Sequence, residues 1–476
     1  MHNLTDTQDD LIENLTYTEL SLGQRAEFSR TVRMADIQAF ALVSGDVNPA
    51  HVDAEYAQDT RFHGVIAHGM FAGALISSLL GTEFPGPGTI YLEQSLRFQC
   101  PVRVGDRLTV AVTVVEKDDT NHNVRMDCVV VNQLMKTVVS GQALVKAPET
   151  KVSRSRIAMP TMHLFDPTAR LEAWMATQPA QPRLRCAVVH PCDEVSLRGA
   201  LDAAQYGLIE PVLVGPARKL HALASELGLS LDGCTVVDTA HSHASAAVAC
   251  AMAARGEAPM LMKGSLHTDE LMKAVLAEPA LRTGRRLSHV FRFEVPTYPK
   301  PLLVTDAAIN IRPTLEEKAD ILRNVIDLAH LLGVSLPKVA LLSAVETVTP
   351  SIASTLDAAA LCKMADRGQI KGALLDGPLA FDNAISSEAA QIKNLVSNVA
   401  GDADVLMVPD LESGNMLAKQ LEYLAGAASC GVVLGARVPI ALTSRADAPV
   451  QRRASAALAV LVASRRAESG GPETTR

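Results

Sequence analysis

Apolar and polar residues follow different patterns in the two parts of the chain. From residue 22 to residue 145 the pattern predicts two helices and then short strands. The first helix, residues 34–43, has apolar positions spaced by about 3.6 residues and ends at Gly45. The second, residues 70–80, is apolar except for two serines. A helix without a polar face has to be buried on all sides, so we expect the helix at residues 70–80 to be completely buried.

Four stretches rich in Val, Thr and Leu follow the second helix, with turn residues between them. They predict strands at residues 89–98, 107–115, 124–132 and 137–145. The simplest packing of these elements is one helix wrapped by an antiparallel sheet, which places this part of the chain in the α+β class.

Beyond residue 163, short apolar strands alternate with helical stretches. The helices include residues 200–206 and 315–332, and we expect strands at residues 186–189, 211–214, 234–237, 301–304, 338–342, 372–375 and 405–408. This alternation is typical of βαβ units in a mostly parallel sheet with helices on both faces. Roughly 300 residues exceed one small domain, so we expect a two-lobed α/β domain with a cleft.

The boundary between the two patterns lies in a stretch of Lys, Arg, Ser and Thr with little periodicity. We therefore expect one domain at residues 18–147, a linker at 148–163 and a second domain at 164–466. The charge changes at the same place. Residues 1–150 contain 11 Lys and Arg against 19 Asp and Glu, which accounts for the whole net charge of −8.

The composition excludes several classes of protein. With 476 residues, of which 48% are apolar and 20% charged, the chain is globular and long enough for about three domain-sized units. Its net charge of −8 and its 4% of aromatic residues disfavour nucleic acid as a partner. The eight cysteines lack the spacing of a zinc site, so we expect no metal. The chain shows no signal peptide and no membrane-spanning run, and we expect a cytoplasmic protein without a membrane partner.

The densest chemistry in the first part is the sequence SGDVNPAH, residues 44–51. Its Asp46 and His51 lie five residues apart across an Asn-Pro turn, so a loop can direct a carboxylate and an imidazole toward one point. The alternative is that Asp46 only binds turn amides and His51 only caps a helix. Gly69 opens the apolar helix, where free backbone N–H groups at the positive helix end can hold a ligand carbonyl oxygen. This arrangement is an oxyanion hole in outline.

Three motifs of this part, GDVNPAH, AHGM and YLEQSLRFQCPVRVGD, occur in the order and spacing of a known family. They resemble the MaoC-like, R-specific enoyl-CoA hydratases of the hotdog fold. The resemblance implies a long central helix in a curved antiparallel sheet and a homo-oligomer, usually a dimer. It also implies that Asp46 and His51 are the catalytic pair, that the backbone of Gly69 donates to the thioester oxygen, and that Ser77 lies near the substrate.

The hydration of a 2-enoyl-CoA makes definite demands on such a site. It needs a base to take a proton from water, an acid to protonate Cα, and donors to hold the developing enolate. A carboxylate and an imidazole on one water can supply the first two, and which residue moves which proton stays open. A domain that only binds acyl-CoA or oligomerises is the alternative.

Three segments of the second part follow predicted strands, where the ligands of an open α/β sheet bind. They are DGPLAFD with Asp376, PDLESGNMLAK with Asn415, and LTSRAD with Ser444 and Arg445. The chain has neither GxxxxGKS/T nor a GxGxxG after a strand, which argues against P-loop and dinucleotide sites. A serine hydroxyl beside a guanidinium suits a phosphate. The alternatives are a turn carboxylate, a helix cap and a surface ion pair of Arg445 with Asp447.

Together with VTDAAIN upstream, these segments resemble the strand-end motifs of the phosphate acetyl/butyryltransferase family. The resemblance implies a two-lobed fold whose cleft binds acyl-CoA and phosphate, or an acyl phosphate, and moves the acyl group between CoA and phosphate. Ser444 and Arg445 match the phosphate and thioester pocket as catalytic residues, and Arg282 is a weaker match. We add Asp376 and Asn415 as substrate-binding candidates.

The second part departs from the bacterial acetyltransferases at two positions. Gln451 stands where those enzymes have an acid, thought to activate the CoA thiol, and Asp447 is the nearest carboxylate. Tyr423 stands where they have an arginine. Both changes favour the butyryltransferase side of the family, and they leave the base and the acyl length open.

Taken together, the motifs predict a bifunctional enzyme of acyl-CoA metabolism, a hydratase followed by a phosphate acyltransferase. Its partners would be enoyl-CoA, acyl-CoA and phosphate, with coenzyme A as a substrate carrier and no cofactor. Two alternatives stay open. One is a transferase whose hotdog domain only binds CoA or dimerises, and the other is a CoA-sensing scaffold without activity.

Overall fold

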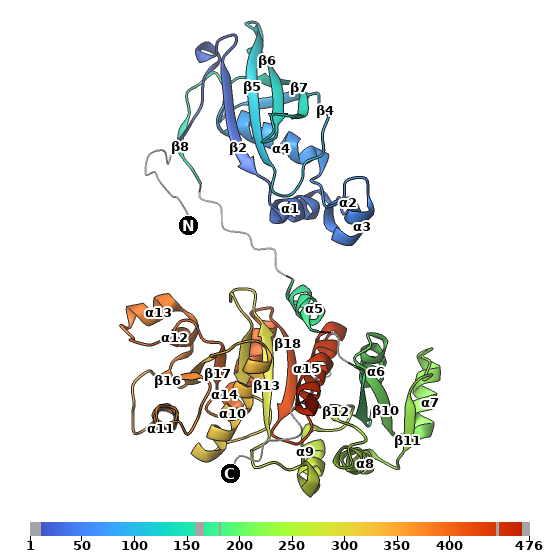
Figure 1. Ribbon diagram of the computed structural model, residues 1–476. Coiled ribbons are helices and arrows are strands. Elements are labelled where there is room, and N and C mark those ends of the chain that lie inside the picture. Colours follow the sequence, from blue (N-terminus) through green and yellow to red (C-terminus); the bar gives the residue numbers. More distant parts are fainter. Residues whose placement is uncertain (1–10, 158–165, 180–181, 444–446, 469–476) are drawn as a thin grey trace. The chain divides into compact units, whose positions relative to one another are not determined.

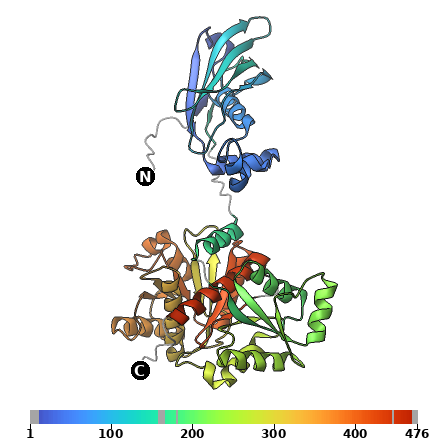
Figure 2. The same cartoon turned by 45° about the vertical axis from the view of Figure 1, so that its right-hand side comes forward.

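The computed structural model describes residues 11–157, 166–179, 182–443 and 447–468. The chain forms two compact units, Met1–Leu164 and Phe165–Arg476, shown in Figure 1 and, turned by 45°, in Figure 2. The division falls at the end of the stretch in which the sequence predicts a linker. Among the residues described, none of the helices combines the length and the apolar character that crossing a membrane requires.

In its described residues, the first unit has a six-stranded antiparallel sheet with the strand order β2-β5-β6-β7-β3, and β4 pairs with β7. The strands are β2 (Arg25–Thr31), β3 (Ile90–Gln94), β4 (Arg97–Phe98), β5 (Arg107–Asp118), β6 (Asn123–Val131) and β7 (Thr137–Lys146). The helices are α1 (Met34–Ser44), α2 (Pro49–Val52), α3 (Ala54–Asp59), α4 (Gly69–Thr82) and the short 3-10 helix η1 (Tyr17–Glu19). These elements confirm the predicted α+β hotdog arrangement.

The helix α4 packs against this sheet and supplies much of the core of the first unit (Figure 1). Its buried side chains, spaced to lie on one side, are Phe71, Ala72, Leu75, Ile76, Leu79 and Leu80. The opposite face is exposed and carries Met70, Ser77 and Ser78. The expectation that this helix is buried on all sides is therefore wrong for the chain as described. The sheet covers one side, and the whole helix looked apolar because the exposed side carries Met70 and small residues but no charged residue.

A two-stranded antiparallel pairing joins the ends of the first unit. β1 (Leu11–Glu13) pairs with β8 (Ser153–Ser155), so that Leu11 lies opposite Ser155. The side chain of Asn14 supports the pairing, because its amide donates to the carbonyls of Pro87 and Thr150 at 3.0 and 2.8 Å. Part of the stretch in which the sequence predicts a linker is thus bound to the first unit.

An eleven-stranded sheet runs through the described part of the second unit, in the order β11-β10-β9-β12-β19-β18-β13-β14-β17-β15-β16. The strands are β9 (Leu184–Val189), β10 (Ile209–Gly215), β11 (Thr235–Asp238), β12 (Met260–Lys263), β13 (Ser288–Glu294), β14 (Leu302–Thr305), β15 (Lys338–Leu342), β16 (Leu374–Leu379), β17 (Val405–Met407), β18 (Ala428–Leu434) and β19 (Ile440–Ala441). Neighbours are parallel except at β18-β19, β13-β18 and β13-β14. The predicted mostly parallel sheet is confirmed, and it is continuous.

Helices cover both faces of this sheet, and Figure 2 shows α15 crossing it. They are α5 (Pro167–Thr177), α6 (Glu194–Gln205), α7 (Ala217–Glu226), α8 (Ser242–Ala254), α9 (Thr268–Ala277), α10 (Leu315–Leu331), α11 (Ala353–Asp366), α12 (Phe381–Ile385), α13 (Ser387–Ile392), α14 (Leu411–Tyr423), α15 (Pro449–Glu468) and the 3-10 helix η2 (Pro279–Leu281). On one face a single core runs beneath α6, α10 and α15. On the other face there are two cores, one beneath α8 and α9 and one beneath α14. The two expected lobes correspond to these two cores.

The pattern of apolar residues missed three of these strands, β12, β13 and β18, whereas β19 is the strand expected before LTSRAD. β13 explains why such strands are hard to find, because buried polar residues interrupt it. His289, Arg292 and Glu294 are all buried, and an ion pair of 2.7 Å joins the last two. The guanidinium of Arg292 also lies 4.6 Å from the ring centroid of Trp174. A buried ion pair of this kind depends on partners that are distant in the sequence.

Candidate active sites

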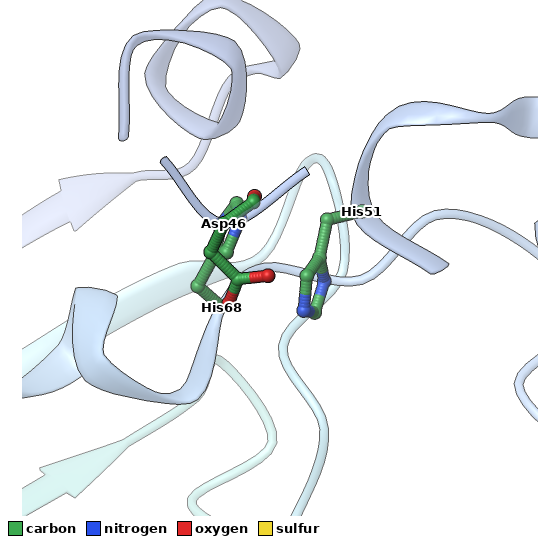
Figure 3. Close-up of side chains that lie close together, drawn as sticks. All are labelled: Asp46, His51 and His68. Carbon is green, nitrogen blue, oxygen red and sulfur yellow. The ribbon is translucent and has the colours of Figure 1, made fainter. Parts of the chain in front are cut away.

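Three side chains of the first unit come together from separate segments (Figure 3). Asp46 lies in the loop after α1, His51 lies in α2, and His68 immediately precedes α4. One ligand atom of each, a carboxylate oxygen or an imidazole nitrogen, lies within 4.8 Å of the other two. Asp46 is exposed, His51 is half-buried and His68 is buried. The structure thus brings the predicted pair together and adds His68 to it, and we call these three residues the Asp46 cluster.

The loop between α1 and α2 determines where Asp46 and His51 lie. α1 ends at Gly45, whose φ of 74° is a left-handed conformation that favours glycine. Asn48 then caps α2, since its side-chain oxygen accepts a hydrogen bond of 3.1 Å from the N–H of Ala50. One oxygen of Asp46 accepts a long bond of 3.3 Å from the N–H of Asn48. Asp46 therefore has the turn role of the alternative interpretation and also faces the histidines.

Two main-chain carbonyls orient the imidazoles of the cluster. Nδ1 of His51 lies 2.8 Å from the carbonyl oxygen of Ile66, and Nε2 of His68 lies 2.8 Å from the carbonyl oxygen of Asp46. Because a carbonyl can only accept, each of these nitrogens carries a proton. In the neutral rings the lone pairs are then on Nε2 of His51 and Nδ1 of His68. The ring centroids are 4.0 Å apart, so the two imidazoles are in contact.

Gly69 is the first residue of α4 and directly follows His68. Its backbone N–H is among those that a helix leaves without an internal acceptor at its N-terminus. A Cβ at this position would lie 3.3 Å from the ring of Phe98, so the space beside Gly69 is narrow. Ser77 lies on the exposed face, eight residues further along the helix, or about 12 Å along its axis. The structure places Gly69 at the Asp46 cluster and does not bring Ser77 into it.

The sequence analysis gave no role to His68. Its signal was its place in the AHGM motif, directly before the glycine that begins α4. Its contacts with His51 and with the main chain of Asp46 join residues 17 and 22 positions apart, so they follow from the fold and not from the motif.

In the second unit, the carboxyl ends of β9, β12 and β19 lie side by side. His190 follows β9, Gly264 follows β12 and Thr443 lies just beyond β19. The predicted catalytic residues Ser444 and Arg445 come next in the chain and lie outside the described residues. Their described neighbours therefore define this candidate site, which we call the β19 end.

The start of α15 shows what occupies the position of the missing acid. Gln451 accepts a hydrogen bond of 2.7 Å from the N–H of Ala448, so its side chain caps α15 from the third helical position. Arg452 follows it and is buried, and burial lowers the pKa of its guanidinium while the charge of Asp447 raises it. Nε of Arg452 also donates to the carbonyl of Asp447 at 3.2 Å. Asp447 and Arg452 thus form the charged border of the β19 end.

Lys419 on α14 is close enough to Asp447 for the charge of Asp447 to affect its pKa. Burial lowers its pKa, but the hydrogen bond and the charge of Glu422 raise it, and Tyr423 and Asp447 add to that rise, so the pKa lies above its usual value. The ammonium group of Lys419 lies 5.7 Å from the ring centroid of Tyr423. The sequence analysis did not single out Lys419 or Arg452, whose closeness to Asp447 depends on how α14 and α15 pack.

Asp376 and Arg282 lie away from the β19 end. Asp376 is on the edge strand β16, six positions from β19 in the sheet, or about 29 Å at ~4.8 Å per strand. It accepts a bond of 2.8 Å from the N–H of Gly377, which is the turn role. The backbone of Arg282 forms an isolated antiparallel β-bridge with Ala436, which precedes β19. The Nε of Arg282 donates to the carbonyl of Leu276 at 2.7 Å. The structure does not bring either residue to the carboxyl end of β19.

Asn415 lies on the exposed surface of α14, four residues before Lys419. Its amide nitrogen is 3.4 Å from the carbonyl oxygen of Ala307, in the loop after β14. It therefore lies on the same helix as Lys419, nearer the N-terminus of that helix.

An apolar cavity of about 700 Å³ lies beyond the carboxyl ends of β15 and β17, against α14. The α14 side chains that line it include Leu417, Leu421 and Leu424. At helical spacing these lie on the side of α14 opposite to Lys419 and Tyr423. The cavity is therefore separate from the charged border of the β19 end, and its lining suits an apolar group.

Two family models match the chain. The model described as MaoC like domain matches residues 18–136, and the model described as Phosphate acetyl/butaryl transferase matches residues 243–460. The phosphate acetyltransferase of Rhizobium meliloti is 59% identical over 280 residues, which cover 59% of this chain and 89% of that protein. The phosphate butyryltransferase of Clostridium acetobutylicum is 41% identical over 280 residues, which cover 59% of this chain and 93% of that protein.

A solved structure agrees with these matches. A branched-chain phosphotransacylase from Enterococcus faecalis V583 superposes with a TM-score of 0.52 at 30% sequence identity, covering 59% of this chain and 99% of that chain. The second unit is thus a two-lobed acyltransferase fold, and the first is a hotdog domain. The chain belongs to the phosphate acetyl/butyryl transferase family and carries a MaoC-like domain ahead of the transferase.

Proposed function

We propose that the chain is a bifunctional acyl-CoA enzyme. The first unit reversibly hydrates a 2-enoyl-CoA to a 3-hydroxyacyl-CoA, and the second transfers a short acyl group between CoA and phosphate. The Asp46 cluster carries the first assignment, because it sets a carboxylate and an imidazole lone pair at the N-terminus of α4. The 59% identity to a phosphate acetyltransferase carries the second.

In the hydratase site, one water molecule lies between the Asp46 carboxylate and Nε2 of His51. One of the two takes a proton from the water while the oxygen forms a bond to C3 of the enoyl thioester, and a proton is delivered to C2. Charge that develops on the thioester oxygen is stabilised by the N–H of Gly69 and by the positive end of α4. His68 holds the main chain of Asp46 through its Nε2.

In the transferase site, Ser444 and Arg445 bind the phosphate, and the buried cation Arg452 contributes positive charge nearby. The sulfur of CoA leaves or attacks as the thiolate, so a carboxylate that takes its proton is useful. Gln451 caps α15 and cannot take a proton, whereas Asp447 is a carboxylate beside Arg452. We propose Asp447 for this role and acetyl as the acyl group, since the acetyltransferase relative is more similar than the butyryltransferase, at 59% against 41% identity.

The hydratase assignment is tested by the loss of enoyl absorbance of crotonyl-CoA. We expect Asp46→Asn to abolish the reaction in the full-length protein without loss of secondary structure. Asp59→Asn, an exposed carboxylate at the end of α3, is the matched control and should leave the rate unchanged. Near wild-type turnover in Asp46→Asn would rule out this mechanism.

The transferase assignment is tested by the release of free thiol from acetyl-CoA and butyryl-CoA when phosphate or arsenate is added. We expect acetyl-CoA to be the better substrate and Arg445→Ala to remove the phosphate dependence. Arg198→Ala, on the exposed face of α6, is the control. A wild-type protein that shows no phosphate dependence with either ester would exclude the transferase.

We also propose that neither reaction needs a metal or a prosthetic group, and that the protein is a homo-oligomer. Treatment with a chelator should leave both activities unchanged. Light scattering during size-exclusion chromatography should give a mass that is a multiple of 50.6 kDa.

A further inference from the structure

Each residue of the Asp46 cluster has an atom that offers an electron pair. Nδ1 of His51 and Nε2 of His68 hold their protons toward main-chain carbonyls, so the opposite nitrogens carry lone pairs. The Asp46 carboxylate adds a third electron-pair group within 4.8 Å. Three such groups attract a water that donates protons or a cation that accepts electron pairs.

His68 gives a second and independent reason to expect a ligand. The residue is only 3% exposed, and its Nδ1 has no hydrogen-bond partner. Buried polar atoms are normally satisfied, and one that is not calls for an explanation such as an ion. Of the residues that the structure describes, only Asp46, His51 and His68 form a group of three that could hold a metal ion.

The surroundings of the two histidines are those of metal ligands. A ligating histidine almost always donates its other N–H to a carbonyl, a carboxylate or a water, which fixes the tautomer and the ring orientation. The carbonyls of Ile66 and Asp46 do this for His51 and His68, each at 2.8 Å. Two imidazole nitrogens and one carboxylate oxygen, with a position left open, suit Zn²⁺ better than Mg²⁺, which prefers oxygen ligands.

We propose that Asp46, His51 and His68 bind a zinc-type divalent cation, which occupies the place of the hydration water and so inhibits the hydratase. Ligand atoms on a tetrahedral zinc with bonds of about 2.0 Å lie about 3.3 Å apart, so the cluster contracts on binding. Asp46 can make that movement, because it is exposed and its side chain accepts only one long bond, from Asn48. The inhibition rests on the proposed hydratase function, whereas the binding does not.

Binding is tested on the full-length protein by competition for Zn²⁺ with a chromophoric chelator. His68→Gln is the main variant. Glutamine keeps a side-chain N–H for the carbonyl of Asp46, but it has no nitrogen in place of Nδ1. We expect it to weaken zinc binding at least about tenfold. It should also abolish the visible absorption of Co²⁺ bound in the same site.

His63→Asn is the matched control, because it removes an exposed histidine outside the cluster. Its φ of 52° is a conformation that asparagine tolerates. We expect this variant to bind zinc as the wild type does, and Mg²⁺ not to compete. Equal zinc affinity in the wild type and in His68→Gln would overturn the metal site.

The functional half is tested by hydration of crotonyl-CoA with increasing Zn²⁺. We expect half-inhibition at the free zinc concentration at which the site is half occupied, and recovery after a chelator is added. Hydration that continues with zinc bound would overturn the inhibition. A protein that binds zinc but never hydrates crotonyl-CoA would contradict the proposed hydratase and leave the binding result in place, so the two failures are distinct.

Discussion

Asp36 ties the start of α1 to the neighbouring strand, and its replacement measures how much this charge stabilises the first unit. The residue is 8% exposed. One carboxylate oxygen accepts from Nη2 of Arg30 at 2.6 Å and from Nη2 of Arg33 at 3.1 Å. The other accepts from the backbone N–H and from Nε of Arg33 at 2.9 and 3.2 Å. Asparagine at this position keeps the size of the side chain and removes its charge.

The pKa of Asp36 gives the magnitude of this stabilisation. Burial alone would raise it, but the hydrogen bonds and charges of Arg33 and Arg30 lower it from 3.8 to about 2. Because the folded-state pKa lies below the unfolded one, the ionised carboxylate stabilises the folded state, fully above about pH 5. The stabilisation is lost as the pH falls from there toward 2. A shift of this size corresponds to about 2 kcal/mol at pH 7.

We therefore expect Asp36→Asn to lower the free energy of unfolding of the first unit by about 2 kcal/mol at pH 7 and by about 1 kcal/mol at pH 3. The assay is urea unfolding of the full chain, followed by far-UV circular dichroism. The one tryptophan, Trp174, lies in α5, so its fluorescence reports the second unit and serves as an internal reference. That signal should not change.

The control is Glu27→Gln, which removes an exposed carboxylate paired with the exposed Arg25. It should cost less than about 1 kcal/mol, as exposed ion pairs do. If Asp36→Asn cost no more than this control at pH 7, or cost as much at pH 3 as at pH 7, the reasoning from the Asp36 pKa would be refuted.

Three further substitutions test the packing and the second site. Gly264→Ala would place a Cβ 2.3 Å from the carbonyl oxygen of Val189. We therefore expect phosphate-dependent thiol release to fall at least about tenfold, while hydration of crotonyl-CoA is retained. Transferase activity above half of the wild-type value would contradict this. Gln451→Glu should keep the cap of α15 and change the transferase rate by less than about threefold, whereas a large gain would identify position 451 as the place of the base. Leu80→Ala, at a fully buried position of α4, should lower the free energy of unfolding of the first unit by about 2–5 kcal/mol in urea titrations, and a loss below about 1 kcal/mol would show that the core there can collapse.

Local patterns in the sequence predicted most strands and four of the helices, because burial on one face leaves a repeat of apolar residues. β6 shows the repeat clearly, with Val124, Met126, Cys128 and Val130 buried and the intervening residues less so. The pattern was misleading where exposed residues are small, as on α4. It also failed where buried residues are ionic, as in β13, since the partners that permit their burial lie elsewhere in the chain.

The residues of the candidate sites could likewise be predicted where their contacts are local in the sequence, and not where the contacts depend on the fold. Asp46 and His51 could be predicted as a pair because one short loop carries both. His68 could not, because its contact with His51 depends on how α4 enters the core. For Asp376, the sequence predicted a position just after a strand, whereas β16 runs from Leu374 to Leu379 and contains it. Strand order, in addition, is not a local property. The sheet places β16 at its edge, far from β19.

The pairing of β1 with β8 makes the first unit a module that the chain enters and leaves at one place. Leu11 lies opposite Ser155, so the whole MaoC-like domain is contained between two adjacent points of the backbone. A module closed in this way can be joined to a neighbour, or removed from it, without rethreading its sheet.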